Sequence, residues 1–84
     1  MKKNEIESKI KKILTENLEI EISEEDIVGD DLISELGINS VDAISIFISI
    51  EDVFGITIDD EDLSADLISS LNKISQYIMS KMSN

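Results

Sequence analysis

The sequence predicts an all-α fold, a small four-helix bundle of three main helices and one short helix. We expect it to form a single domain over residues 1–84. Three stretches support this prediction, because in each of them apolar residues recur at the spacing of an amphipathic helix. They cover residues 4–18, 40–54 and 67–82. A chain of 84 residues can bury only a modest core, which suits one domain.

The first predicted helix runs from Asn4 to about Leu18. Its inward face carries apolar residues at spacings of four, three and one: Ile6, Ile10, Ile13 and Leu14. Glu5 and Lys9 are four residues apart, in the order that favours an ion pair on a helix surface. We interpret these charges as a solvated face.

A long acidic loop, residues 19–31, separates the first two main helices. A structureless connection of this length is unusual in a compact domain. We therefore expect apolar side chains to pin it: Ile20, Ile22, Ile27 and Val28. Ser23 and Asp26 can cap one helical turn within it. After the break at Gly29-Asp30-Asp31, further apolar residues should dock the following loop onto the bundle: Leu32, Ile33, Leu36 and Ile38.

The second main helix is predicted over residues 40–54. Asn39 is a favoured N-cap residue, Asp42 adds negative charge near the positive end of the helix dipole, and Gly55 suits the C′ position. Isoleucine at every second position of residues 44–50 is instead typical of a strand. We predict a helix because both ends carry caps and no partner strand is evident nearby.

On a helical wheel this segment has two apolar faces. The first is the natural core face: Ala43, Ile46, Phe47, Ile50 and Phe54. The second has Ser40 beside it: Val41, Ile44 and Ile48. A small domain has little interior for a second apolar stripe. Either the helix is central and contacted on two sides, or this stripe faces a partner.

The acidic run Asp59-Asp60-Glu61-Asp62 raises the question of a metal site. It lacks the alternating ligands, central glycine and terminal glutamate of an EF-hand loop, so we expect no dedicated metal site. Asp59 or Asp60 can instead cap a short third helix that runs toward Ala65, with Leu63 as its inward anchor.

The last helix is defined by apolar residues at intervals of four, three, four and four: Leu67, Leu71, Ile74, Ile78 and Met82. Ser69 or Ser70 is the expected N-cap. Lys81 suits the negative end of the helix dipole.

Composition excludes several classes of function. Seven Lys and Arg residues oppose nineteen Asp and Glu residues, and the net charge of -12 repels nucleic acid and anionic lipid and favours partners with basic surfaces. Without Cys or His, the chain forms no disulfide and lacks the commonest metal ligand and general base. No acid-base pair or activated nucleophile is evident, so we expect a protein that is not an enzyme.

No targeting or membrane-spanning segment is evident in the sequence. We therefore expect a soluble, cytoplasmic protein without membrane insertion. We also expect a monomer.

Residues 31–58 resemble the acyl carrier proteins, in which a serine at the start of the second helix carries a 4′-phosphopantetheine arm. The family's Asp-Ser-Leu core is present here as Asn39-Ser40-Val41, preceded by Leu36-Gly37 and followed by Asp42. The run Ile50-Glu51-Asp52-Val53-Phe54-Gly55-Ile56-Thr57-Ile58 is similar to the family's acidic helix end, its phenylalanine and its short apolar link. The order of helices extends the resemblance to nearly the whole chain.

The resemblance implies that a phosphopantetheinyl transferase joins the arm of coenzyme A to Ser40. The arm would then carry acyl groups as thioesters to acyl-handling enzymes, such as synthases and acyltransferases, of fatty acid or polyketide-like biosynthesis. In related carriers the cargo folds back between helices, which here would involve Ala43, Ile46, Phe47, Ile50, Leu63 and Ile68. The surface that would meet basic patches on partner enzymes comprises Val41, Asp42, Ile44, Ile48, Glu51 and Asp52.

Several positions depart from the family pattern. Asn39 and Val41 replace Asp and Leu, and Ser45 and Val53 stand where acids are common. A carrier dedicated to a specialised pathway, or a peptidyl or aminoacyl carrier, therefore stays open. Two further alternatives are an unmodified helical interaction module that uses the second apolar stripe, and a regulatory metal binder that uses the acids near Asp60.

Overall fold

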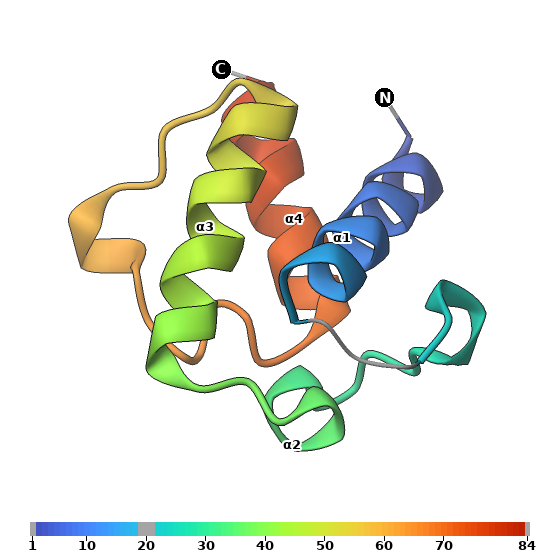
Figure 1. The fold of residues 1–84 in the computed structure, drawn as a ribbon. Helices are drawn as coiled ribbons and strands as arrows, with labels where there is room; N and C mark the ends of the chain where they lie inside the picture. The colour runs from blue at the N-terminus through green and yellow to red at the C-terminus, as the bar shows by residue number, and fades with distance from the viewer. Residues whose placement is uncertain (1, 19–21, 84) are drawn as a thin grey trace.

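Every regular element of the computed structural model, which describes residues 2–18 and 22–83, is helical. Three long helices and one short helix are present (Figure 1): α1 (Lys3–Leu18), α2 (Leu32–Leu36), α3 (Ser40–Phe54) and α4 (Leu71–Met82). Single 3-10 turns occur at η1 (Glu24–Asp26) and η2 (Asp60–Asp62). The predicted all-α fold is confirmed, and residues 44–50 lie within a helix despite their strand-like alternation.

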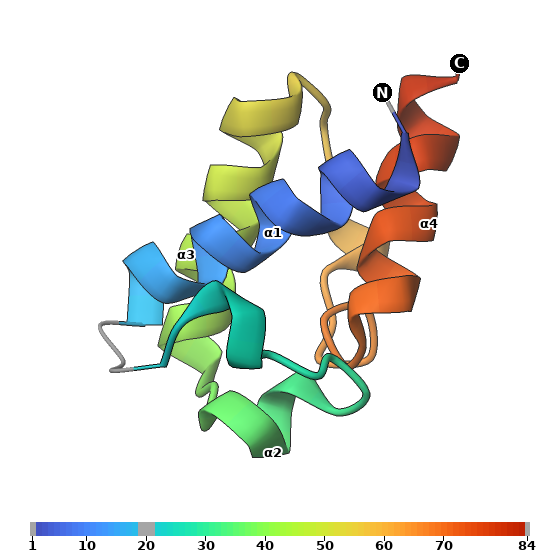
Figure 2. The same ribbon diagram turned by 90° about the vertical axis from the view of Figure 1, so that its right-hand side faces the viewer.

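The core forms where α1 crosses α3 and α4 and packs against both (Figure 2). All four inward residues expected on α1 are buried: Ile6, Ile10, Ile13 and Leu14. On α3, four of the five expected residues are buried, and Ala43 packs against them as a partly buried residue: Ile46, Phe47, Ile50 and Phe54. Burial of these apolar faces is the main source of stability for helices of this length.

The expected cap at Ser70 and the end of α4 at Met82 are confirmed, but the outermost residues of its predicted apolar face, Leu67 and Met82, need correction. The helix begins at Leu71, where the Ser70 side chain accepts a hydrogen bond from the backbone N–H of Lys73 at 3.1 Å. Leu67 therefore lies in the turn before the helix. Met82 is 41% exposed, because the last turn of α4 extends beyond the core.

The short helices also differ from the prediction. Residues 32–36 form a helix where a loop was expected, with the Asp31 carboxylate accepting from the Ser34 N–H at 3.3 Å. The helix expected to run toward Ala65 is only the single turn η2, and Leu63 is 43% exposed rather than an inward anchor. Four successive acids and one large apolar residue provide too little apolar surface to hold a longer helix there.

The acidic loop after α1 is only partly pinned. Ile27 is buried and Ile22 is partly buried, whereas Val28 is 72% exposed. Ile20 lies outside the described residues. The expected helical turn is present as η1, where the Ser23 hydroxyl donates to the Asp26 carboxylate at 2.9 Å.

Backbone and side-chain hydrogen bonds fasten the end of this loop to α2 and α4. The Glu35 carboxylate accepts from the N–H groups of Val28 and Gly29 at 2.7 and 2.9 Å. The Leu71 N–H donates to the Gly29 carbonyl at 2.9 Å, and the Leu32 N–H donates to the Ser69 carbonyl at 2.8 Å. The loop therefore holds α2 beside the start of α4.

Gly29 is required by this contact. Its φ of 89° lies in the left-handed region, and a Cβ atom there would be 2.8 Å from the Leu71 Cβ. We expect Gly29→Ala to lower the free energy of unfolding by about 2–4 kcal/mol, because strain and steric overlap add. Gly55→Ala, at a φ of 64° with open space around it, should cost only about 1 kcal/mol.

Urea unfolding of both variants checks this prediction. Equal losses at the two glycines would contradict the close approach of Gly29 to α4.

Candidate functional site

A tight turn after α2 directs the chain into α3. Gly37 adopts the left-handed conformation with a φ of 65°, and the Ile38 N–H donates to the Ile33 carbonyl at 3.2 Å, which is the bond of a Schellman motif. Ile38 is buried and anchors the chain to the bundle. This turn fixes where α3 begins.

Asn39 caps α3, as its residue type predicts. Its backbone is extended, and its side-chain oxygen accepts from the Asp42 N–H at 2.8 Å. Ser40 follows as the first helical residue and is exposed to solvent. The remaining N–H groups of a first helical turn have no carbonyl partner within the helix, and the positive end of the helix dipole lies there. The surroundings of the Ser40 hydroxyl therefore favour a negatively charged group.

A cavity of about 460 Å³ lies beside Ser40, between α3 and the chain that connects α3 to α4. Its α3 wall includes Ser40, Ala43 and Phe47. The opposite wall includes Leu63 and Ile68. Most of the lining is apolar, so the cavity can accept an apolar chain that enters beside Ser40.

Four of the six residues expected to form an acyl slot line this cavity: Ala43, Phe47, Leu63 and Ile68. Ile46 and Ile50 are fully buried in the core and are not part of the lining. Six apolar residues outside the expected set also contribute: Ile33, Ile38, Ile44, Ile48, Ile58 and Ala65. The sequence marks them as apolar, but periodicity along one helix does not show which distant segments meet it.

The second apolar stripe of α3 faces solvent. Val41, Ile44 and Ile48 are 71%, 60% and 59% exposed, so no described part of the chain covers them. Ile44 and Ile48 also line the cavity. The sequence left open whether α3 is contacted on two sides or presents this stripe to a partner. In the structure the stripe lies on the outward surface of the helix.

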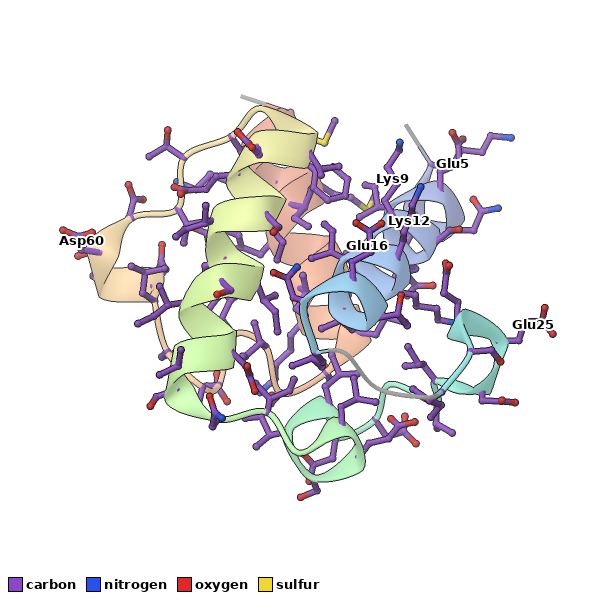
Figure 3. The ribbon with its side chains drawn as sticks, viewed as in Figure 1. Glu5, Lys9, Lys12, Glu16, Glu25 and Asp60 are labelled. Carbon is purple, nitrogen blue, oxygen red and sulfur yellow. The ribbon has the colours of Figure 1, made fainter. Side chains whose placement is uncertain are left out.

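The three acids expected around this stripe have different environments. Asp52 is exposed and borders a shallow groove between α3 and α1, where Lys9 and Lys12 project from α1 (Figure 3). Asp42 is partly buried at the start of the helix. The Glu51 carboxylate accepts from the Ile58 N–H at 2.9 Å, so it holds the chain that leaves α3.

Within residues 2–18 and 22–83, no group of three or more His, Cys, Asp or Glu side chains is arranged to hold a metal ion. None of the helices in this part of the chain combines the length and the apolar character needed to cross a lipid bilayer.

Comparison with known proteins agrees with this geometry. The chain matches the family model for the phosphopantetheine attachment site over residues 8–78. It is 34% identical over 77 residues to the acyl carrier protein of Desulforapulum autotrophicum, covering 90% of this chain and 96% of that protein. It is 36% identical over 82 residues to the acyl carrier protein of Thermotoga maritima, covering 95% of each chain. The acyl carrier protein of Buchnera aphidicola is 36% identical over 77 residues, covering 90% of this chain and 91% of that protein.

The fold and these matches define a helical carrier domain of the phosphopantetheine-bearing class. The chain belongs to the acyl carrier protein family. This confirms the resemblance that residues 31–58 suggested. The protein is thus a carrier rather than an enzyme, and its prosthetic group is a covalently attached 4′-phosphopantetheine.

Proposed function

We propose that the 4′-phosphopantetheine group is attached to the Oγ atom of Ser40 and that the protein delivers acyl cargo from there to partner enzymes. The observation that carries this proposal is the exposed Ser40 hydroxyl at the rim of a largely apolar cavity of about 460 Å³. When attached, the group supplies a terminal thiol that holds the acyl cargo as a thioester.

The start of α3 suits the phosphate of this group. A phosphodiester on Ser40 carries a negative charge, and the unpaired N–H groups and the dipole of α3 stabilise it. The Asn39 side-chain oxygen accepts from the Asp42 N–H and so caps this turn. Exposure of Ser40 gives a phosphopantetheinyl transferase access to Oγ without unfolding the helix.

The attachment site is tested by the intact mass of the protein after incubation with coenzyme A and a broad-specificity phosphopantetheinyl transferase. We expect the wild type to gain one phosphopantetheine group and Ser40→Ala to gain none. Ser45→Ala is the matched control, because Ser45 is also an exposed serine of α3, and it should load normally.

Loading of Ser40→Ala would assign the attachment to another residue. No mass gain in the wild type with several transferases would favour the unmodified interaction module.

We further propose that part of an acyl cargo enters the cavity beside Ser40. Phe47 and Ile68 supply apolar surface on opposite walls, and Ala43 leaves space between them because its side chain is small. Transfer of an alkyl chain from water to such a lining is favourable by about 0.8 kcal/mol per buried methylene.

Chemical shifts in the loaded protein test this binding. A long acyl cargo should shift the Ala43 and Ile68 methyl signals and the Phe47 ring signals, whereas an acetyl cargo should leave them close to those of the unacylated form. Ile6, which lies on α1 and is not part of the cavity lining, serves as the internal reference. Equal shifts with both cargoes would remove the cavity from the mechanism.

The exposed stripe of Val41, Ile44 and Ile48 is the proposed contact surface for partner enzymes. Asp42 and Asp52 lie on α3 to one side of the stripe, and the net charge of -12 would steer basic surfaces toward it. Long-range attraction brings the partners together, and close contact with the stripe then orients Ser40 toward the active site of the enzyme.

Ile44→Asp tests this surface. We expect kcat/KM for loading by the transferase to fall about tenfold, because a charge replaces an apolar contact residue next to Ser40. Met82→Asp is the matched control, since Met82 is also an exposed apolar residue but lies at the C-terminal end of α4. Equal effects of the two substitutions would mean that added negative charge, rather than the stripe, determines the loss.

Two exposed positions of α3 bear on the pathway. Ser45 and Val53 stand where related carriers commonly have acids, so the partner-facing helix is less acidic here. This pattern keeps a carrier dedicated to a specialised pathway, such as polyketide-like synthesis, as an alternative to the general fatty acid role. Acceptance of an amino acid rather than an acyl group would instead indicate an aminoacyl or peptidyl carrier.

A further inference from the structure

The chain between α3 and α4 is held at its ends by burial but not along its length. Ile58 and Ile68 are 4% and 1% exposed. Residues 59–67 between them, called the strap below, include no fully buried residue, and of their apolar side chains only Leu67, at one end, packs against the core. Figure 1 shows the strap bowing outward beside α3, and Asp60 projects away from the bundle (Figure 3). The hydrophobic effect therefore contributes little to the position of the strap.

Polar side chains of α4 hold the strap instead. Three of them, called the latch below, lie at four-residue intervals on one face of α4: Lys73, Tyr77 and Lys81. Each donates a hydrogen bond of 2.8 to 2.9 Å to an acid of the strap, and the acids follow in reverse order along the chain: Asp66, Asp62 and Asp59. The Lys81 ammonium also lies 5.5 Å from the centroid of the Tyr77 ring. The three side chains of the latch thus form one row along α4.

The three contacts differ in strength. Lys73 and Asp66 are 51% and 80% exposed, so water and salt screen this ion pair. Lys81 is half as exposed as Lys73, and Tyr77 donates from a partly buried position. Burial and the hydrogen bond to Asp62 raise the pKa of the Tyr77 phenol above its ordinary value. Tyr77 is therefore the principal member of the latch.

We infer that the latch positions the strap as the outer wall of the cavity beside Ser40 and thereby sets how readily cargo moves between the cavity and solvent. Leu63, Ser64 and Ala65 of the strap line that cavity. Release of the latch frees this wall while the packing of α1 against α3 and α4 stays intact. The inference rests on the proposed function for its cargo, but the contacts themselves are properties of the unloaded protein.

The first test uses the unloaded protein. Amide exchange with water, measured by NMR at Leu63, Leu67 and Ser69, reports the strap, because these N–H groups bond to carbonyls within it. Tyr77→Phe keeps the ring and removes the donor, so exchange at these amides should rise about fivefold. The exchange rates of amides in α1 should rise only by the amount that the loss of global stability accounts for.

Conservative and charge variants separate the latch from general destabilisation. Asp62→Asn keeps an acceptor oxygen for Tyr77 and should leave strap exchange near the wild-type rate. Raising salt to about 1 M should accelerate strap exchange in the wild type, but much less in a double variant carrying Lys73→Met and Lys81→Met. Lys11→Met, on α1, is the matched control for loss of a lysine and should keep the salt response.

The second test uses protein loaded with a long acyl chain. Relaxation dispersion at the Ala43 and Ile68 methyl groups measures exchange of the chain between cavity and solvent, and Tyr77→Phe should raise its rate about fivefold. Unchanged strap exchange in both Tyr77→Phe and the lysine double variant would overturn the latch. Faster strap exchange with unchanged cargo exchange would overturn its role in cargo movement. Failure of the carrier function would be seen separately, as an absent mass gain on incubation with coenzyme A.

Discussion

The position of Ser40 depends on how the loop before α2 is fixed to α4. At Gly29 the backbone of this loop comes so close to Leu71 that no other side chain fits, and the Gly29 carbonyl accepts the Leu71 N–H. The Glu35 carboxylate holds the same loop from within α2 by accepting two backbone N–H groups. Since α2 leads within a few residues into α3, these contacts determine where the first turn of α3 lies relative to the core.

A carboxylate also accepts a backbone N–H of a loop at the other end of α3. Glu51 accepts the Ile58 N–H at 2.9 Å, as Glu35 accepts those of Val28 and Gly29, so each carboxylate takes the place of a missing backbone partner in a loop. The net charge of -12 is therefore not all available for partner recognition. A buried or partly buried loop N–H is costly to leave unpaired. Glu51, which a comparison of charges alone would assign to docking, has this structural role as well.

Local signals in the sequence were sufficient to predict the long helices and the place of Ser40 at the start of α3. The cap at Asn39, the left-handed Gly55 and the spacing of the buried faces all act within a few residues, so they can be recognised before the structure is known. The helix α2 was missed because five residues are too few to establish a period. The cavity and the strap were only partly foreseen, because they depend on contacts between distant residues, such as Tyr77 with Asp62 and Phe47 opposite Ile68.

The two walls of the cavity are held by different forces, and under the proposed function this difference would let a small carrier both enclose and release a cargo. The α3 wall includes Phe47, whose helix is packed against α1, and moving it would expose core surface to water. The strap wall is held by hydrogen bonds and ion pairs, each of which exchanges with water at a small net cost. The strap can therefore open at a far lower free energy than the bundle unfolds, which is the behaviour expected of a local opening in a stable domain. A cargo attached beside Ser40 would encounter a rigid wall on one side and a releasable wall on the other.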